Sequence, residues 1–245
     1  MTVKIRPLGG ALCLAVLAFA CSGGLNGVVR SPNPVTASSE VTPDRGSVVF
    51  SDDFNDPKSG WSTDNVADFK ASFNKSGYVF VVTGFVDHEV SAPYLTPKDQ
   101  LSVSVTATES STSPVGSGFG AGCDRGLTEP TISYDFHVAV GGTWGIFRHD
   151  LRRAAGSQHS LLKQGTSPKA PGPILRTVVL ICATLSDAVT TRLVMFVDGT
   201  QVADIADPVS DLPRLGWVGG LVVTGEDSGP TTVTVTHFEE RDLRF

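Results

Sequence analysis

Acidic side chains are the first residues of this sequence to consider for chemistry. Two carboxyl groups held about 5–5.5 Å apart can cleave a glycosidic bond, and the densest acidic group on a strand-like segment is Glu239, Glu240 and Asp242. We expect these acids at a solvated strand end. His88 and His149 each adjoin an acid, but adjacent residues of a strand point to opposite faces. The pattern therefore predicts no catalytic residues, and we expect a protein that is not an enzyme.

A second set of residues suits ligand binding. Tyr134, His137, Trp144 and Arg148 combine aromatic rings with hydrogen-bonding groups, and a sugar can be held by an aromatic face with polar neighbours. Large aromatic side chains on alternating strands are more often core residues, so we expect Tyr134 and Trp144 to lie inside. We expect His137 and Arg148 to face outwards. The ligand-binding candidates are therefore His137, Trp144 and Arg148.

A third group, Asp52, Asp53 and Asp56, has the oxygen ligands that Ca²⁺ prefers. The DxDxDG pattern of a calcium loop is absent, and Asp, Asn and Pro are also the residues of a plain turn. We favour the turn, so no metal or other cofactor is expected.

The elements that must position these residues read as β-strands. Gly141-Gly142 and Asp198-Gly199 each separate two such segments and predict tight hairpin turns. No segment has the pattern of an amphipathic helix, and the many short segments predict an all-β antiparallel sandwich or barrel. The apolar–polar alternation of a strand marks Tyr78–Phe85, Gln100–Thr108, Gly116–Cys123, Ser133–Val140, Thr143–Arg148, Leu175–Thr184, Arg192–Val197, Gln201–Ala206, Gly216–Val223 and Thr231–Phe238.

Length and charge narrow the class of protein. The 245 residues are enough for one large all-β domain with a full core, and 40% hydrophobic with 18% charged residues is typical of a folded chain. The formal charge is −6 and no basic run is present. Nucleic acid selects clustered Lys and Arg, so we expect no nucleic-acid partner.

The N-terminal residues predict export. Lys4 and Arg6 precede an apolar stretch, Leu8–Ala20, which is short for a membrane-spanning helix and has the pattern of a signal peptide. The letters LAFAC at Leu17–Cys21, followed by SGG, resemble the lipobox of bacterial lipoproteins, in which the cysteine is lipidated and becomes the new N-terminus. The letters AFA before Cys21 also satisfy the small-x-small rule of ordinary signal cleavage.

The number of cysteines favours lipidation. Cys13 lies inside the signal and is lost with it, which leaves Cys21, Cys123 and Cys182. An exported protein with an odd cysteine needs a use for it. Lipidation of Cys21 leaves Cys123 and Cys182 as a pair that an oxidising exterior would join. Neither has the CxxC or His spacing of a metal site.

The chain divides into three parts. Residues 1–20 form the predicted lipoprotein signal peptide. Residues 21–46 begin at the lipidated Cys21, are rich in Ser, Gly, Pro and Thr, and predict a flexible tether. Residues 47–245 form one domain.

The order of segments in this domain resembles that of a known family. FSDDFNDPKSGW, the Gly-rich strand with GAGC, YDFHVAVGGTWGIFR, LLKQG, LICAT, LVMFVDGTQVADI and VTVTHFEERDL follow one another. This order is similar to the laminin-G-like, concanavalin A-like jelly-roll domains of bacterial surface proteins and lipoproteins. The resemblance implies two stacked antiparallel sheets, and in such domains the corresponding cysteines are often paired on neighbouring strands. It implies no single activity, because the fold hosts lectins, glycanases and adhesion modules.

Together these observations predict a lipoprotein on the extracytoplasmic side of a cell membrane. Its domain is expected to bind a glycan or an envelope protein without catalysis. A glycan-acting hydrolase on the same fold, and a structural or accessory subunit of an envelope complex, are the alternatives.

Overall fold

The computed structural model describes residues 42, 46–85, 87–94, 96–125, 132–154, 157–167, 175–209 and 216–243. The predicted signal peptide and Cys21 lie outside the described residues. Within the described ranges the chain forms strands and turns and no helix. None of these residues therefore forms a helix long and apolar enough to cross a membrane.

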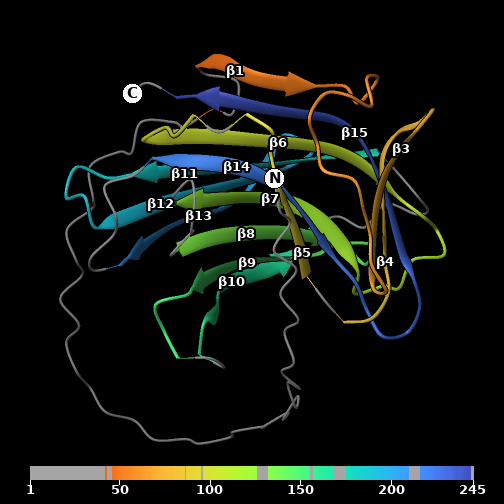
Figure 1. Ribbon diagram of the computed structural model, residues 1–245. Coiled ribbons are helices and arrows are strands. Elements are labelled where there is room, and N and C mark those ends of the chain that lie inside the picture. The colour runs from red at the N-terminus through yellow and green to blue at the C-terminus, as the bar shows by residue number, and fades with distance from the viewer. Residues whose placement is uncertain are drawn as a thin grey trace, which may run out of the picture.

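The described strands pair into two antiparallel sheets that stack face to face (Figure 1). Sheet A has nine strands in the order β13-β12-β11-β6-β15-β4-β3-β2, and β1 pairs with β15 beside that path. Its strands are β1 (Ser47–Asp52), β2 (Asp64–Asn65), β3 (Phe69–Asn74), β4 (Gly77–Val82), β6 (Gln100–Glu109), β11 (Leu175–Thr184), β12 (Thr190–Val197), β13 (Thr200–Pro208) and β15 (Thr231–Asp242).

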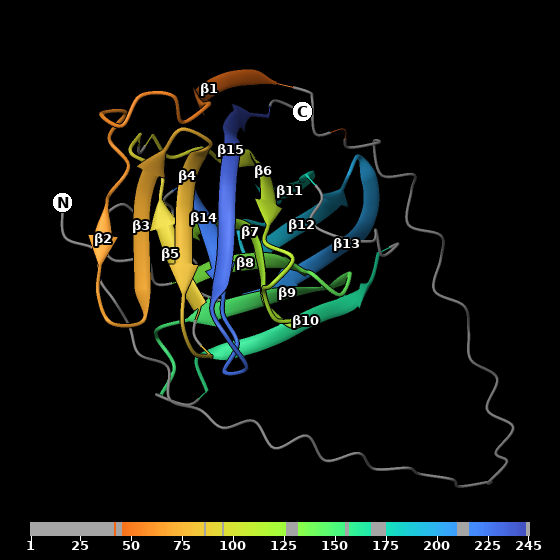
Figure 2. The ribbon, with the colours of Figure 1, turned by 90° about the vertical axis from the view of Figure 1, so that its right-hand side faces the viewer.

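Sheet B has six strands in the order β10-β9-β8-β7-β14-β5. They are β5 (Asp87–Ser91), β7 (Gly118–Arg125), β8 (Ile132–Ala139), β9 (Thr143–Asp150), β10 (His159–Thr166) and β14 (Trp217–Thr224). Sheet B is strongly twisted. Its twist is visible in two views, in which β5 runs steeply across the direction of β9 and β10 (Figures 1 and 2). The fold is a jelly-roll sandwich, as the sequence predicts.

All ten segments predicted as strands form strands, and both predicted hairpins are present. Gly142 has a φ of 82° between β8 and β9. Asp198 and Gly199 have φ of 50° and 76° between β12 and β13, which is the pair of positive angles that a type I′ turn requires. The β2, β3, β5 and β10 strands escaped the sequence analysis, and β5 and β10 contribute to the candidate site below.

The hydrophobic core lies between the sheets, because alternate residues of each strand point inwards. Sheet B contributes Phe119, Tyr134, Phe136 and Ile146, and all four side chains are buried. Sheet A contributes large buried residues such as Tyr78, Phe80, Leu101, Leu180 and Phe238. At one end of the sandwich the Trp61 ring lies edge-on to Phe238, with ring centres 4.9 Å apart.

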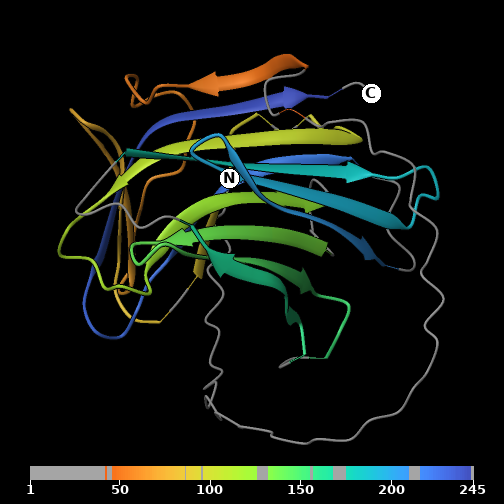
Figure 3. The ribbon, with the colours of Figure 1, turned by 180° about the vertical axis from the view of Figure 1, so that it is seen from behind.

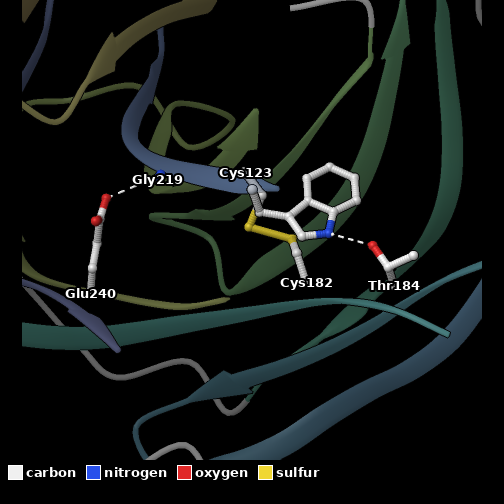
Figure 4. The surroundings of a disulfide bond; sticks show 6 residues. Cys123, Cys182, Thr184, Gly219 and Glu240 are labelled. Atoms are coloured by element: carbon white, nitrogen blue, oxygen red, sulfur yellow. Dashed lines mark hydrogen bonds between the residues drawn. A yellow bond between two sulfur atoms is a disulfide. The ribbon is translucent and has the colours of Figure 1, made fainter. Parts of the chain in front are cut away.

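A disulfide joins the two sheets through this core (Figure 4). Cys123 of β7 and Cys182 of β11 are fully buried, their Cα atoms lie 6.5 Å apart, and 59 residues separate them in sequence. The predicted pairing is confirmed. The Trp217 indole donates a hydrogen bond to Thr184 Oγ1 at 3.1 Å. Closing a loop of this length stabilises the folded chain by roughly 4 kcal/mol on the chain-entropy account.

Candidate ligand-binding face of the six-stranded sheet

The side of sheet B that faces away from the core carries a cluster of acidic and histidine side chains. We call this side the outer face of sheet B, and no described strand packs against it (Figures 1 and 3). Strand alternation puts the neighbours of the core residues on it. Its side-chain-bearing members include Asp87, Glu89, Asp124, Ser133, Asp135, His137, Phe147, His149, His159, Leu161, Val222 and Thr224.

Glycines on β7 and β14 let two carboxylates converge on this face. A Cβ atom at Gly122 would lie 2.7 Å from Glu89 Oε1 and 3.4 Å from Asp135 Oδ1. A Cβ atom at Gly220 would lie 3.1 Å from the same Glu89 oxygen. Because β14 and β7 separate β5 from β8, the two acids approach from opposite sides of a stretch of bare backbone. Larger residues at these two positions would keep them apart.

Asp135 is held by a histidine of the neighbouring strand. Its Oδ2 lies 2.7 Å from His149 Nε2, and only 3% of Asp135 is exposed. Burial alone would raise the pKa of Asp135, but the charge of His149 and its hydrogen bond outweigh burial and lower it. Burial would likewise lower the pKa of His149, whereas the charge and hydrogen bond of Asp135 raise it. The pair is therefore stabilised in its charged form.

A second histidine lies against the first. The rings of His149 and His159 meet edge to face with their centres 4.0 Å apart. Burial and the neighbouring charge of His149 lower the pKa of His159. Asp87 and Asp124 add negative charge that raises the pKa of His149. Asp135 therefore favours the protonated form of His149, which lies among acidic side chains.

Three buried polar atoms on this face, Asp87 Oδ1, Asp135 Oδ1 and His137 Nε2, have no hydrogen-bond partner among the described residues. Asp135 and His137 lie two residues apart on β8 and so share a face. His137 Nδ1 lies 2.5 Å from Thr224 Oγ1, which fixes the ring. The half-buried ring of Phe147 lies 5.0 Å from the His137 ring. A buried polar atom without a partner is costly, so this arrangement is suited to a ligand that supplies hydrogen bonds beside an apolar ring.

The ligand-binding residues predicted from the sequence do not all reach this face. His137 does, as expected, and Trp144 lies in the core with 7% exposure, as expected for a large aromatic. The expectation that Arg148 faces outwards is wrong. Arg148 Nη1 lies 2.9 Å from both carboxylate oxygens of Asp207 on β13 of the opposite sheet, and Tyr134 donates to the same carboxylate at 2.8 Å. Residues four apart in a strand share a face, so a buried Trp144 requires an inward Arg148.

The C-terminal acids also differ from expectation. Glu240 is only 2% exposed rather than solvated, and the Gly219 N–H donates to its Oε1 at 3.0 Å (Figure 4). Burial raises the pKa of Glu240 to about 7. Glu239 lies near the surface and pairs with Arg241. Glu240 lies between the sheets, so it is not part of the outer face of sheet B.

Asp52 and Asp56 accept hydrogen bonds within or near their own turn, and Asp53 pairs with His237 of β15. Asp52 accepts hydrogen bonds from the Phe54 N–H and from the Trp61 indole at 2.6 and 2.9 Å, and Asp56 accepts one from the Lys58 N–H at 2.8 Å. The described residues contain no group of three His, Cys, Asp or Glu side chains placed to hold a metal.

Sequence analysis missed Glu89, Asp135 and His149 as members of one site. Asp135 and His137 alternate with core residues on β8, so their common face was visible in the sequence. The side chains of DHEVS at Asp87–Ser91 also alternate between the two faces of the sheet. The charged residues in this segment make it look unlike a strand in the sequence. The approach of Glu89 to Asp135 across two intervening strands depends on the twist of the sheet and has no local signal.

Comparisons with known proteins agree with the architecture. No protein family and no curated protein matches this sequence. A structure from work on endo-acting O-glycanases of the human gut microbiota is similar, with a TM-score of 0.57, 12% identity and coverage of 81% of this chain and 100% of that one. The alginate lyase Aly36B has a TM-score of 0.52 and 9% identity, and the match covers 80% of this chain and 98% of that one. The Lotus tetragonolobus seed lectin has a TM-score of 0.50 and 11% identity, with coverage of 78% of this chain and 96% of the lectin. At these identities the likeness shows the concanavalin A-like fold alone.

Proposed function

We propose that this protein binds a glycan on the outer face of sheet B without cleaving it. The proposal also places the protein on the extracytoplasmic side of a cell membrane, held by a lipid on Cys21. The observation that carries the binding role is the pair of buried, unpartnered atoms, Asp135 Oδ1 and His137 Nε2, beside the Phe147 ring. Sugar hydroxyls donate and accept hydrogen bonds, and the apolar face of a sugar ring packs on an aromatic side chain.

The structural neighbours support this role without deciding it. One is a seed lectin and another is the carbohydrate recognition domain of Emp46p, which has a TM-score of 0.50 and 11% identity to this chain. A sandwich with polar side chains gathered on one sheet face is a scaffold that can hold glycans. Since the neighbours also include an alginate lyase, the absence of cleavage is part of the proposal.

A glycan-array measurement tests the binding role. Full-length protein in detergent micelles is applied to an array of bacterial and plant glycans, and any hit is measured by calorimetry. His137→Ala removes one unpartnered atom and is expected to weaken binding by roughly tenfold or more, the value of one to two polar contacts. Asp204→Asn removes an exposed acid of sheet A and serves as the control. Equal binding by the two variants would place the ligand elsewhere.

The lipid anchor needs a separate measurement, because Cys21 lies outside the described residues. Intact mass of protein extracted from its native membrane is expected to show loss of residues 1–20 and a diacylglyceryl adduct. Two acyl chains suffice for stable attachment, whereas one chain binds a membrane only marginally. An unmodified mature chain would contradict the anchor.

One observation favours a glycan-acting hydrolase as a second candidate. Glu89 and Asp135 both approach Gly122, and a converging acid pair is what glycosidic hydrolysis requires. One carboxyl would protonate the leaving oxygen while the other attacks the anomeric carbon or activates a water. Release of new reducing ends from a bound glycan, abolished by Glu89→Gln, would favour this candidate over binding alone.

A further inference from the structure

We propose that the outer face of sheet B selects glycans that carry a free amino group, with the ammonium of a hexosamine held between Glu89 and Asp135. This inference rests on the proposed glycan-binding function and names the class of glycan. It concerns recognition only and involves no chemical step.

The charge of this face favours a cationic ligand. Its described residues include the acids Asp87, Glu89, Asp124 and Asp135 and no Lys or Arg. Arg148 of β9 faces the core and is paired with Asp207. The pKa of His149 is raised, and its Nε2 already contacts Asp135 Oδ2. The face therefore keeps an excess of negative charge even when His149 is protonated.

The position of that charge fits an ammonium group. Glu89 Oε1 and Asp135 Oδ1 lie against the same glycine, Gly122, and both atoms are shielded from solvent. Only 3% of Asp135 is exposed, and its Oδ1 has no hydrogen-bond partner among the described residues. A hydroxyl would offer one donor and no charge. An ammonium offers three donors and a positive charge, and hydrogen bonds between ionised groups are about twice as strong as neutral ones.

The neighbouring groups complete a site for a sugar ring. Phe147 of β9 lies directly opposite Asp135 of β8. Its ring offers an apolar surface for the sugar ring that bears the amine. His137, fixed by Thr224, offers Nε2 to a hydroxyl. The same excess of acid repels glycans made of uronic acids. The predicted order of affinity is therefore free amine first, the neutral N-acetylated form second, and the polyuronate last.

The test uses three hexasaccharides that share a β-1,4-linked pyranose backbone. Full-length protein in detergent micelles is titrated by calorimetry at pH 6 with a glucosamine, an N-acetylglucosamine and a mannuronate hexamer. The glucosamine hexamer is expected to bind roughly tenfold tighter than the N-acetylated hexamer, and its affinity is expected to fall as NaCl rises from ~50 to ~500 mM. The mannuronate hexamer is expected to show no binding.

Two variants test whether the preference for the free amine depends on the Glu89–Asp135 pair or only on the net charge of the protein. Glu89→Gln is expected to remove the preference for the free amine, so that the two hexamers bind with similar affinity. Asp204→Asn, on the other sheet, removes the same charge and is expected to change neither affinity. Circular dichroism of each variant establishes that the sandwich is intact before titration.

The outcomes distinguish the two proposals. Equal or tighter binding of the N-acetylated hexamer, or a preference that survives Glu89→Gln, would overturn amine selection and leave glycan binding standing. Absence of binding to all three hexamers and to every glycan of the array would overturn the proposed function itself.

Discussion

Arg148 of β9 and Asp207 of β13 form a buried ion pair across the core, with Arg148 Nη1 2.9 Å from both carboxylate oxygens. About 9% of Arg148 and 8% of Asp207 is exposed. The pair and the Cys123–Cys182 disulfide are thus two separate links between sheet A and sheet B. An arginine that looks like a surface ligand-binding residue in the sequence is a structural residue in the fold.

Replacing Arg148 by Ala is expected to destabilise the fold and to leave ligand binding unchanged. The substitution leaves Asp207 buried without its counter-ion, a change that costs about 3–5 kcal/mol. Urea unfolding followed by tryptophan fluorescence measures the loss. Arg192→Ala, which breaks the more exposed pair with Asp204, is the control and is expected to cost about 1 kcal/mol or less. Weaker glycan binding by folded Arg148→Ala would return this residue to the list of ligand contacts.

Removing the disulfide is expected to cost about as much stability as breaking the Arg148–Asp207 ion pair. The Cys123→Ala and Cys182→Ala double variant loses the constraint on a chain segment of 59 residues, worth roughly 4 kcal/mol, and also leaves a small void in a fully buried position. Its unfolding midpoint in urea should not change with reductant, whereas that of the parent protein should fall. A reductant-independent midpoint in the parent would show that the cysteines are not joined in solution.

The fold was largely predictable because its signals are local. Alternation marks Ser133–Val140 and its hairpin partner, and Asp198-Gly199 marks a type I′ turn by residue type alone. The site was only half predictable. His137 follows from alternation on β8, but the approach of Glu89 to Gly122 depends on twist accumulated over several strands. The burial of Glu240 likewise depends on a facing glycine, Gly219, that belongs to the other sheet.

Replacing Asp135 by Asn is expected to lower the pKa of His149. The carboxylate charge and its hydrogen bond are what raise that pKa against the effect of burial, and Asn removes the charge while keeping the shape. A pH titration of the histidine ring signals by NMR measures the shift. His88 is the internal reference, because its ring stacks on Phe69 away from this face, with ring centres 4.1 Å apart. An unchanged His149 titration would show that the pair does not persist in solution.

Replacing Glu240 by Gln is expected to stabilise the protein at alkaline pH. The folded pKa is about 7 against a usual value of 4.5, so the unfolded chain releases its proton first as pH rises. The contribution of Glu240 to stability is therefore complete below about pH 4.5 and is lost as pH rises through 7. Gln keeps the acceptor for the Gly219 N–H and carries no charge to bury.

The measurement for Glu240 is the difference in unfolding free energy between parent and variant at pH 5 and pH 8. We expect the Gln variant to be more stable than the parent by about 2–3 kcal/mol at pH 8 and by about 1 kcal/mol or less at pH 5. Glu239→Gln, a neighbouring acid paired with Arg241 near the surface, is expected to show no such pH dependence. A constant difference at both pH values would mean that Glu240 titrates as a normal carboxyl in the folded protein.

Phe147 and Trp144 give the sharpest separation between the face that binds and the face that packs. They are three residues apart on β9 and therefore point to opposite sides of sheet B. Phe147→Ala removes the half-buried ring beside His137 and is expected to weaken glycan binding by roughly tenfold, with a stability change within about 1 kcal/mol. Trp144→Ala empties a core position and is expected to cost about 3–5 kcal/mol.

Trp144→Phe keeps most of the core volume and, in its folded form, should bind glycan as the parent does. Tyr94→Ala, an exposed aromatic stacked on Phe50, controls for the loss of a surface ring. Suppose instead that Phe147→Ala lowers stability and the Trp144 variants weaken glycan binding. The ligand would then lie between the sheets, and the outer face of sheet B would not be the binding site.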